Sequence, residues 1–329
     1  MVVATKSCGS ISRNAFGSRS IYCQCAGSCN GDYAIRKHAN AVTAGFDSNH
    51  IQRAFGRAAT TYAQHSALQR EVEDRLLERL DYFEGKPTRV LDIGCGPGRG
   101  TLALRKRFTG AQIVALDIAL PMLKAIRPGW LRPVARVCAN AIDLPLADTS
   151  VDVLFSNLCV QWIDDVPALL DEFRRVLRPN GYVAFSTFGP DTLYELRAAW
   201  SMADNTPHVS EFADIARLGD AMMAAGFRNP VLDVDRFTQS YADAPSLMRG
   251  LKSIGATNAD PRRQRGLMGK SHYRRAVEAY ENFRVDGKLP ATYEVINAHA
   301  WAPDAGQPGR GEAGEIASFS VDQLRGSRR

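Results

Sequence analysis

Two apolar runs, each ending in a polar element, constrain the fold of this chain more than any other feature. The first run, over 90–93, leads into the glycine-rich turn Gly94-Cys-Gly-Pro-Gly98. The second run, over 113–116, ends at Asp117. Short apolar runs bounded by turn residues are typical of buried strands in a parallel sheet. The two runs therefore predict strands whose carboxyl ends bring a glycine-rich turn and a carboxylate together.

The spacing of the glycines limits which ligand the turn can hold. A dinucleotide turn has the spacing G-x-G-x-x-G, whereas this one is Gly94-x-Gly96-x-Gly98, with an arginine where the third glycine would stand. NAD is therefore disfavoured. Asp92 would repel a phosphate but can orient the loop or meet an ammonium group. The pattern resembles the class I S-adenosylmethionine-dependent methyltransferases, with Asp117 accepting from the ribose; an ordinary α/β protein with a glycine-rich turn is the alternative.

Helical and strand-like segments alternate along most of the chain. Apolar residues at helical spacing predict an amphipathic helix within Gln64–Phe83. Alternation beyond it favours an α/β fold with a doubly wound, mostly parallel sheet that binds ligands at the carboxyl ends of its strands. The resemblance implies seven strands in a Rossmann-like arrangement, an N-terminal helix and a helical insertion after the fifth strand. The expected strands are 88–93, 112–117, 133–138, 151–156 and 181–187, and the expected helices are 99–108, 120–126 and 165–177.

Composition narrows the class of protein. The 329 residues are 45% hydrophobic, enough for one large α/β domain, and they include neither a long apolar run nor a secretory signal, so no membrane span is expected. The net charge of +6 is spread among many acidic residues, which suits an acidic partner better than a nucleic-acid groove. Cys95, Cys138 and Cys159 stand singly in apolar segments, which predicts reduced thiols and a cytoplasmic location. We expect a monomer.

The N-terminal segment differs from the rest of the chain. Residues 1–45 are rich in Ser, Gly, Cys and Asn and lack a hydrophobic period, so we predict a disordered leader or a mis-assigned start. Their acid-poor composition also resembles a mitochondrial transit peptide. Their four cysteines match no zinc-site spacing, and no metal is expected. The methyltransferase domain is expected over 50–325, with a helical substrate-binding insertion within 190–285.

Further cofactor contacts are expected where other strands end. Asn140 follows 133–138, where enzymes of this class commonly hold the adenine amine with Asp, and an amide oxygen can accept the same hydrogen bond. Asn157 follows 151–156, beside the expected methyl-donor pocket. The expected cofactor-binding residues are Tyr62, Gln69, Asp92, Gly94, Gly96, Gly98, Asp117, Ile118, Asn140, Ala141 and Asn157.

A second group of motifs is more specific than the glycine-rich turn. These motifs are Phe55–Tyr62, Leu68–Arg70, Thr187–Arg197, His208–Phe212, Leu247–Asn258 and Leu289–Trp301. Together they closely resemble the malonyl-acyl-carrier-protein O-methyltransferases of biotin synthesis, over about residues 50–325. The resemblance implies that S-adenosylmethionine methylates the free carboxylate of a malonyl thioester on acyl carrier protein, so that fatty-acid synthesis can elongate it toward pimelate.

The chemistry of that reaction indicates what the acceptor site requires. A carboxylate with a pKa of about 4 is ionised at neutral pH, so no general base is expected, and the enzyme has to align an oxygen with the methyl group. Arg249 and Lys252 share one face of a predicted helix, and a guanidinium suits a planar carboxylate; the alternative is a solvated basic face. His208 and Tyr293 are weaker candidates. The basic residues expected to steer an acidic carrier protein are Arg262, Arg263, Arg265, Lys270, Arg274 and Arg275.

Two other functions stay open at this point. One alternative is a respiratory complex I assembly factor that hydroxylates an arginine. Such a protein shares this core and would suit a transit-like N-terminus. The Gly-Pro-Gly turn and the segments around His208 and Arg249 favour the carboxyl methyltransferase instead. A small-molecule carboxyl methyltransferase of the trans-aconitate type would not need a basic surface for a carrier protein.

Overall fold

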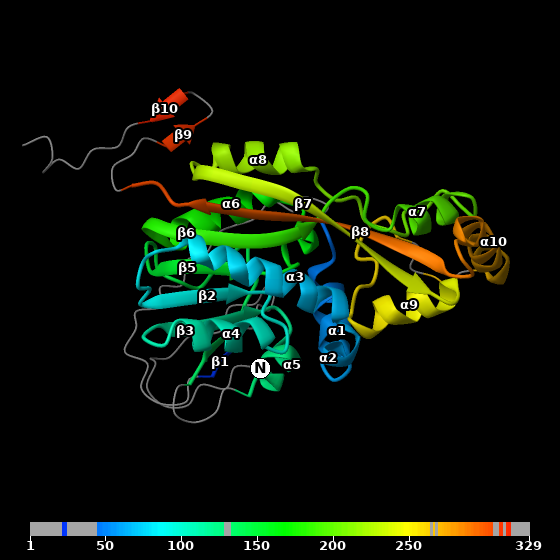
Figure 1. The fold of residues 1–329 in the computed structure, drawn as a ribbon, viewed down its shortest axis with the longest axis horizontal. Coiled ribbons are helices and arrows are strands. Elements are labelled where there is room, and N and C mark those ends of the chain that lie inside the picture. Colours follow the sequence, from blue (N-terminus) through cyan, green and yellow to red (C-terminus); the bar gives the residue numbers. More distant parts are fainter. Residues whose placement is uncertain are drawn as a thin grey trace, which may run out of the picture.

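The computed structural model describes residues 22–24, 45–127, 133–263, 266, 269–304, 309–311 and 314–316. In this part of the chain, a layered α/β domain carries a smaller helical lobe at one end (Figure 1). No helix among these residues combines the length and apolar character needed to cross a bilayer.

The α/β domain is built on a sheet with the strand order β1-β4-β3-β2-β5-β6-β8-β7. Neighbouring strands from β4 to β6 are parallel, and β8 is antiparallel to both β6 and β7. Strands β2 to β8 thus form the expected seven-stranded, mostly parallel sheet, and β1 adds an antiparallel edge strand beside β4. The strands are β1 (Tyr22–Gln24), β2 (Arg89–Ile93), β3 (Gln112–Asp117), β4 (Ala135–Cys138), β5 (Val151–Ser156), β6 (Leu177–Phe188), β7 (Arg228–Tyr241) and β8 (Leu289–Trp301), and β9 (Gly309–Gly311) pairs separately with β10 (Gly314–Ile316).

Helices cover both faces of the sheet because successive side chains of a strand point to opposite faces. Leu91 and Ile93 of β2 belong to the same apolar cluster as Phe173 of α6, whereas Val90 belongs to the cluster of Leu104 of α4. One face is covered by α6 (Val166–Val176) and α8 (Ile215–Ala224), and the other by α3 (Ala67–Glu78), α4 (Arg99–Arg107) and α5 (Leu120–Ala125). Both layers keep the strands rigid beneath the site.

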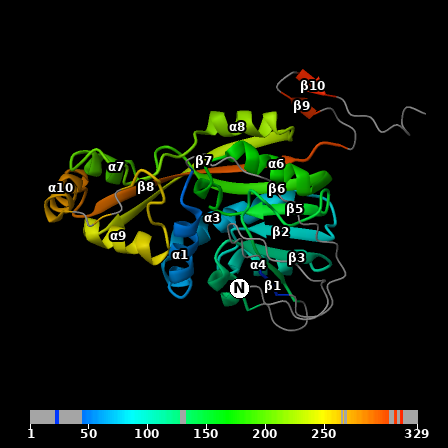
Figure 2. The same ribbon diagram turned by 180° about the vertical axis from the view of Figure 1, so that it is seen from behind.

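The helical lobe is attached through two long strands. β7 and β8 run past the sheet, and the lobe helices surround their far ends in both views (Figures 1 and 2). The lobe has its own apolar cluster, which includes Leu247, Tyr280 and Tyr293. Its helices are α7 (Tyr194–Ser201), α9 (Ala244–Ser253) and α10 (Lys270–Tyr280), and α1 (Ser48–Ala58) and α2 (Tyr62–His65) lie between the lobe and the α/β domain. The stretch 190–285 therefore contains lobe helices together with α8 and β7 of the domain.

The structure differs from the sequence-based prediction in a few elements. The predicted helix within Gln64–Phe83 is divided into α2, α3 and a 3-10 helix at Arg79–Tyr82, because Ser66 leaves the helical region with ψ of 43°. Helix α1 was not expected. Strand β1 lies within the segment predicted to be a disordered leader, whose remaining residues up to 44 lie outside the described ones, as does Arg265.

Candidate functional site

The candidate site lies at the carboxyl ends of β2, β3 and β5, where the sheet order changes direction. The amides of Gly94 and Cys95 in the turn after β2 donate to the Leu116 carbonyl at 2.8 and 3.1 Å. Gly94 has a φ of +68°, and a Cβ atom there would lie 2.5 Å from Sγ of Cys159. Glycine is therefore required for the turn to pack against the loop that follows β5.

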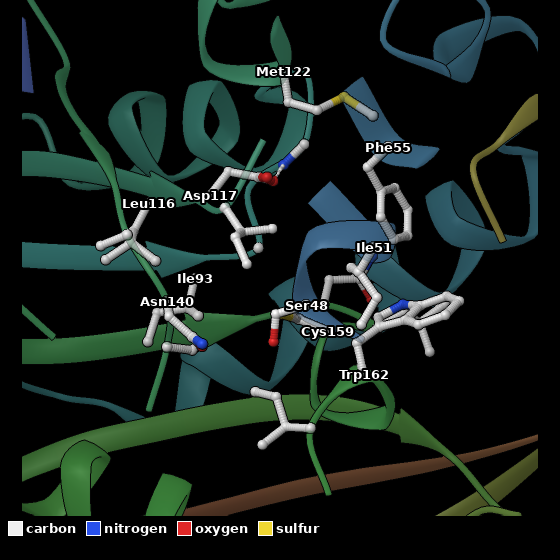
Figure 3. A pocket seen from close by; sticks show the side chains of 18 of the residues that line it. Ser48, Ile51, Phe55, Ile93, Leu116, Asp117, Met122, Asn140, Cys159 and Trp162 are labelled. Carbon is white, nitrogen blue, oxygen red and sulfur yellow. Dashed lines mark hydrogen bonds between the residues drawn. The ribbon is translucent and has the colours of Figure 1, made fainter. Parts of the chain in front are cut away.

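Asp117, at the end of β3, holds the turn and faces a cavity (Figure 3). Its Oδ2 accepts from the Gly96 amide at 2.9 Å, and its Oδ1 accepts from the Ala119 amide at 2.7 Å. Burial raises the pKa of Asp117 to about 6, although both hydrogen bonds oppose the shift. Each carboxylate oxygen has about two lone-pair sites, and each of these two oxygens uses one site for a backbone amide. The remaining site on each oxygen can accept a hydrogen bond from one of two adjacent hydroxyls, such as those of a ribose.

The cavity in front of Asp117, here the Asp117 cavity, has a volume of about 720 Å³. Apolar side chains of β2, β3 and α1 contribute to its walls, and Phe55 packs edge-on against Trp162 with ring centroids 5.2 Å apart (Figure 3). A flat aromatic base with a polar edge fits such a lining. The expected cofactor residues that line it are Tyr62, Gly94, Gly96, Asp117, Ile118, Asn140, Ala141 and Asn157.

A second hollow, the Asp92 cavity, lies on the other side of the turn and is also lined by Gln69 and Asn157. Burial, together with the Glu73 and Asp117 carboxylates, raises the pKa of Asp92 to about 8, although the hydroxyl of Thr101 donates to it. A ligand ammonium group placed beside Asp92 would lower this pKa and favour the ionised carboxylate.

Gly98 was expected among the cofactor contacts but lines neither hollow. It precedes α4 with a φ of +87°, and a Cβ atom there would lie 2.7 Å from Cγ1 of Ile126. Its observed role is therefore to let α4 pack closely.

A third hollow, the His208 cavity, extends from the first two toward the lobe, with a volume of about 820 Å³. Tyr62 lines all three hollows, so it marks the point where a ligand in the Asp117 cavity would meet one in the His208 cavity. Burial raises the pKa of the Tyr62 hydroxyl, which keeps it neutral. Ligands in these two cavities would thus meet beside an uncharged hydroxyl.

The structure separates the four residues expected to position a substrate carboxylate. His208 and Tyr293 line the His208 cavity. Arg249 and Lys252 are exposed on α9, and the side chain of Arg249 is 69% exposed, with Nη2 donating to the Ser246 hydroxyl at 2.8 Å. Leu251 of the same helix lines the cavity instead. The clamp role of Arg249 and Lys252 stays a prediction that this geometry does not support.

Helix α1 supplies site residues that the sequence analysis did not identify, namely Ser48, Ile51 and Phe55 of the Asp117 cavity. The sequence contains a signal for this helix: an Asp that can act as an N-cap, followed by apolar residues at helical spacing. In the structure Asp47 is the N-cap and accepts from the His50 amide, and the apolar residues are buried. Trp162, from the 3-10 helix after β5, lines both the Asp117 and His208 cavities.

Helix α1 is also tied to the loop that closes the His208 cavity. Nε2 of His50 lies 3.0 Å from Oγ1 of Thr257, and the Asp47 amide donates to the Ala259 carbonyl at 3.1 Å. Arg263 pairs with the Asp47 carboxylate at 3.1 Å. The walls of the two large cavities are thus connected by hydrogen bonds.

Comparison with known proteins agrees with this architecture. Residues 91–185 match a family model described as a methyltransferase domain. A solved structure from Bacillus halodurans C-125, described as a methyltransferase, shares the fold with a TM-score of 0.50 and 16% identity, covering 70% of this chain and 98% of that one. Among the described residues, no cluster of His, Cys, Asp and Glu is arranged to hold a metal ion.

Relatives of known name cover most of the chain. The malonyl-[acyl-carrier protein] O-methyltransferase of Xylella fastidiosa (strain M23) is 48% identical over 283 residues, which are 85% of this chain and 96% of that protein. The protein of the same name from Halorhodospira halophila (strain DSM 244 / SL1) is 44% identical over 287 residues, 86% of this chain and 97% of its own length. This chain therefore belongs to the malonyl-[acyl-carrier protein] O-methyltransferase family.

Proposed function

We propose that this protein transfers the methyl group of S-adenosylmethionine to the free carboxylate of malonyl-acyl carrier protein. The observation that carries the proposal is the meeting of the Asp117 and His208 cavities at Tyr62. One cavity offers a ribose acceptor, and the other can hold an acyl group against it. The names of the relatives supply the acceptor class.

The residues around the first two cavities fit the cofactor. Asp117 would accept from both ribose hydroxyls, and Asn140 would accept from the adenine amine. Asp92 would face the ammonium group beyond the turn. When bound, S-adenosylmethionine supplies an electrophilic methyl group on a sulfonium.

Asn157 connects this part of the site to the helical layer. Its Nδ2 donates to the Gln69 carbonyl at 2.9 Å, and its Oδ1 accepts from the Ser186 hydroxyl at 2.8 Å. These bonds hold the start of α3 against the ends of β5 and β6. Asn157 thereby sets the position of Gln69, which lines both the Asp92 and His208 cavities.

The acceptor requires alignment and exclusion of water more than proton transfer. The malonyl carboxylate is already ionised at neutral pH, so the protein need not supply a base. Apolar side chains of the His208 cavity, including Leu196 and Phe188, would exclude water from the acyl chain. The lobe within 190–285 would thus bind the substrate.

The surface of the lobe suits an acidic carrier protein. Exposed cations on two neighbouring helices would steer it, an effect that acts mainly on the association rate and weakens with salt. These cations are Arg249 and Lys252 on α9, and Lys270, Arg274 and Arg275 on α10. Arg262 and Arg263 contribute less, because they pair with Asp260 and Asp47.

Location and assembly complete the proposal. Cys95, Cys138 and Cys159 are free thiols, which supports the cytoplasm as the compartment. We keep the monomer as the proposed state. The arginine-hydroxylating assembly factor and the trans-aconitate methyltransferase are not favoured, because the relatives reported above carry the malonyl-carrier name.

The test is methyl transfer from labelled S-adenosylmethionine to three acceptors: malonyl-acyl carrier protein, free malonate and trans-aconitate. We expect base-labile label on the carrier protein alone. Transfer to trans-aconitate with none to the carrier protein would refute the proposal. Absence of label on all three acceptors would argue against carboxyl methylation as the activity.

A further inference from the structure

The lining of the His208 cavity is unusual for a site that receives a carboxylate. Its polar side chains are hydroxyls and amides, among them Ser210, Thr257 and Asn258. None of the described residues that line it is Lys, Arg, Asp or Glu, and His208 is the single side chain among them that can become a cation. An anion entering this cavity therefore meets one side chain in the described lining that is able to carry a positive charge.

His208 is held in one orientation by a carboxylate outside the cavity lining. Its Nε2 lies 2.9 and 3.1 Å from the two oxygens of Asp204, and 3.0 Å from Oγ1 of Thr206. The imidazole stacks on Trp200 with centroids 3.8 Å apart and planes 13° apart. Because an ionised carboxylate only accepts, Nε2 must carry a hydrogen, which leaves Nδ1 as the remaining nitrogen.

Asp204 is ionised throughout the working pH range. Burial opposes ionisation, but hydrogen bonds from Thr206 and His208 prevail and lower the pKa of Asp204 to about 2. From α10, Nδ1 of His272 lies 3.8 Å from the same carboxylate, and Arg275 donates to the adjacent Ala203 carbonyl at 2.8 Å. Asp204 therefore holds Nε2 of His208 and leaves Nδ1 of the ring as the atom that a ligand anion would meet.

We propose that Asp204 is a positioning residue that fixes the orientation of His208, and that His208 receives the free carboxylate of the acyl substrate through Nδ1–H. The inference rests on the proposed function, which supplies the carboxylate. It assigns Asp204, which lies outside the cavity lining, to substrate selection. The Asp204–His208 pair selects a malonyl group over an acetyl group, because the acetyl group fits the same cavity but has no charge. Bonds are neither made nor broken at the pair, and the proton stays on the ring.

The variants that test the pair are Asp204→Asn and His208→Gln, with His272→Gln as the matched control. His272 also faces Asp204 but does not line the cavity. Binding of malonyl-pantetheine and acetyl-pantetheine is measured by calorimetry in the presence of S-adenosylhomocysteine, and kcat and KM are measured with malonyl-acyl carrier protein.

We expect Asp204→Asn and His208→Gln each to weaken malonyl-pantetheine binding at least tenfold and to leave acetyl-pantetheine and cofactor binding within twofold. The double variant should be no weaker than His208→Gln, because Asp204 acts through that ring. The wild type should bind malonyl-pantetheine at least tenfold more tightly than acetyl-pantetheine. His272→Gln should keep the wild-type preference.

The inference and the proposed function fail in different ways. If the wild type does not methylate malonyl-acyl carrier protein, the proposed function fails, whereas the two thioesters still report on the pair. Equal loss of both thioesters in the variants, or unchanged malonyl binding in both, overturns the role of the pair. Should both variants fail to fold, the wild type decides, because equal affinity for malonyl-pantetheine and acetyl-pantetheine contradicts the proposal.

Discussion

Lowering the pH should weaken nucleoside binding by a calculable amount, because Asp117 has to be ionised to accept from two hydroxyls. Its pKa of about 6 means that nearly all of the carboxyl is ionised at pH 7.5. At pH 5 only about a tenth is ionised, so affinity should fall about tenfold, equivalent to about 1.4 kcal/mol.

Stability should change in the opposite direction over the same interval. The folded pKa of Asp117 lies above the unfolded value of about 3.9, so the native state binds more protons than the unfolded state between pH 4 and 6. Asp92, raised to about 8, adds a contribution of the same sign. The contribution of these two groups to the free energy of unfolding therefore rises as pH falls from 8 to 4. A loss of affinity at low pH cannot then be explained by destabilisation of the fold through these groups.

The assay is calorimetry with 5′-methylthioadenosine, which keeps adenine and ribose but lacks the amino acid that would face Asp92. Asp117→Asn serves as the comparison. Its amide would place a donor against the amide of Gly96 or Ala119, so affinity should fall at least tenfold at pH 7.5 and the pH dependence should vanish. Equal affinity of the wild type at pH 5 and 7.5 would show that Asp117 does not hold the ribose.

Three further predictions concern the turn, the surface and the N-terminus. Gly94→Ala should abolish binding of S-adenosylmethionine by calorimetry, because its Cβ atom would meet Sγ of Cys159 at 2.5 Å; unchanged affinity would contradict the role of the turn. Raising the salt concentration to several tenths molar should raise KM for malonyl-acyl carrier protein more than KM for malonyl-pantetheine. The variant Arg249→Lys should leave kcat within twofold at high salt. A tenfold fall in kcat for that variant would restore the clamp role of Arg249. Deleting residues 1–44 removes the edge strand β1 but no described residue that lines the three cavities, so kcat should stay within twofold; a larger loss in the folded protein would show that this segment serves catalysis.

The sequence predicted the sheet and the cofactor side of the site better than the acceptor side, for physical reasons. Asp117 and the glycines stand at strand ends, where chain order alone determines which groups meet. The side of α9 that faces the cavity depends on how the lobe packs, so helical spacing grouped Arg249 with Lys252 but could not place that face toward solvent.

The role of Asp204 depends on contacts that no local pattern reveals. Its partner His208 is only four residues away, but the stacking on Trp200 and the approach of His272 arise from separate helices. Strand β1 was missed for a similar reason, because it is defined by its pairing with β4, which is distant in the sequence.

The bonds from α1 to the loop at 257–263 should link occupancy of the two large cavities. If α1 shifts when a ligand enters or leaves the Asp117 cavity, the shift strains the contacts of Asp47 with Ala259 and Arg263, and hence the wall of the His208 cavity. Thermodynamic reciprocity then requires that bound acyl thioester change cofactor affinity by the same factor as bound cofactor changes thioester affinity. Inhibitors directed at either cavity should consequently be compared with the other cavity both empty and filled.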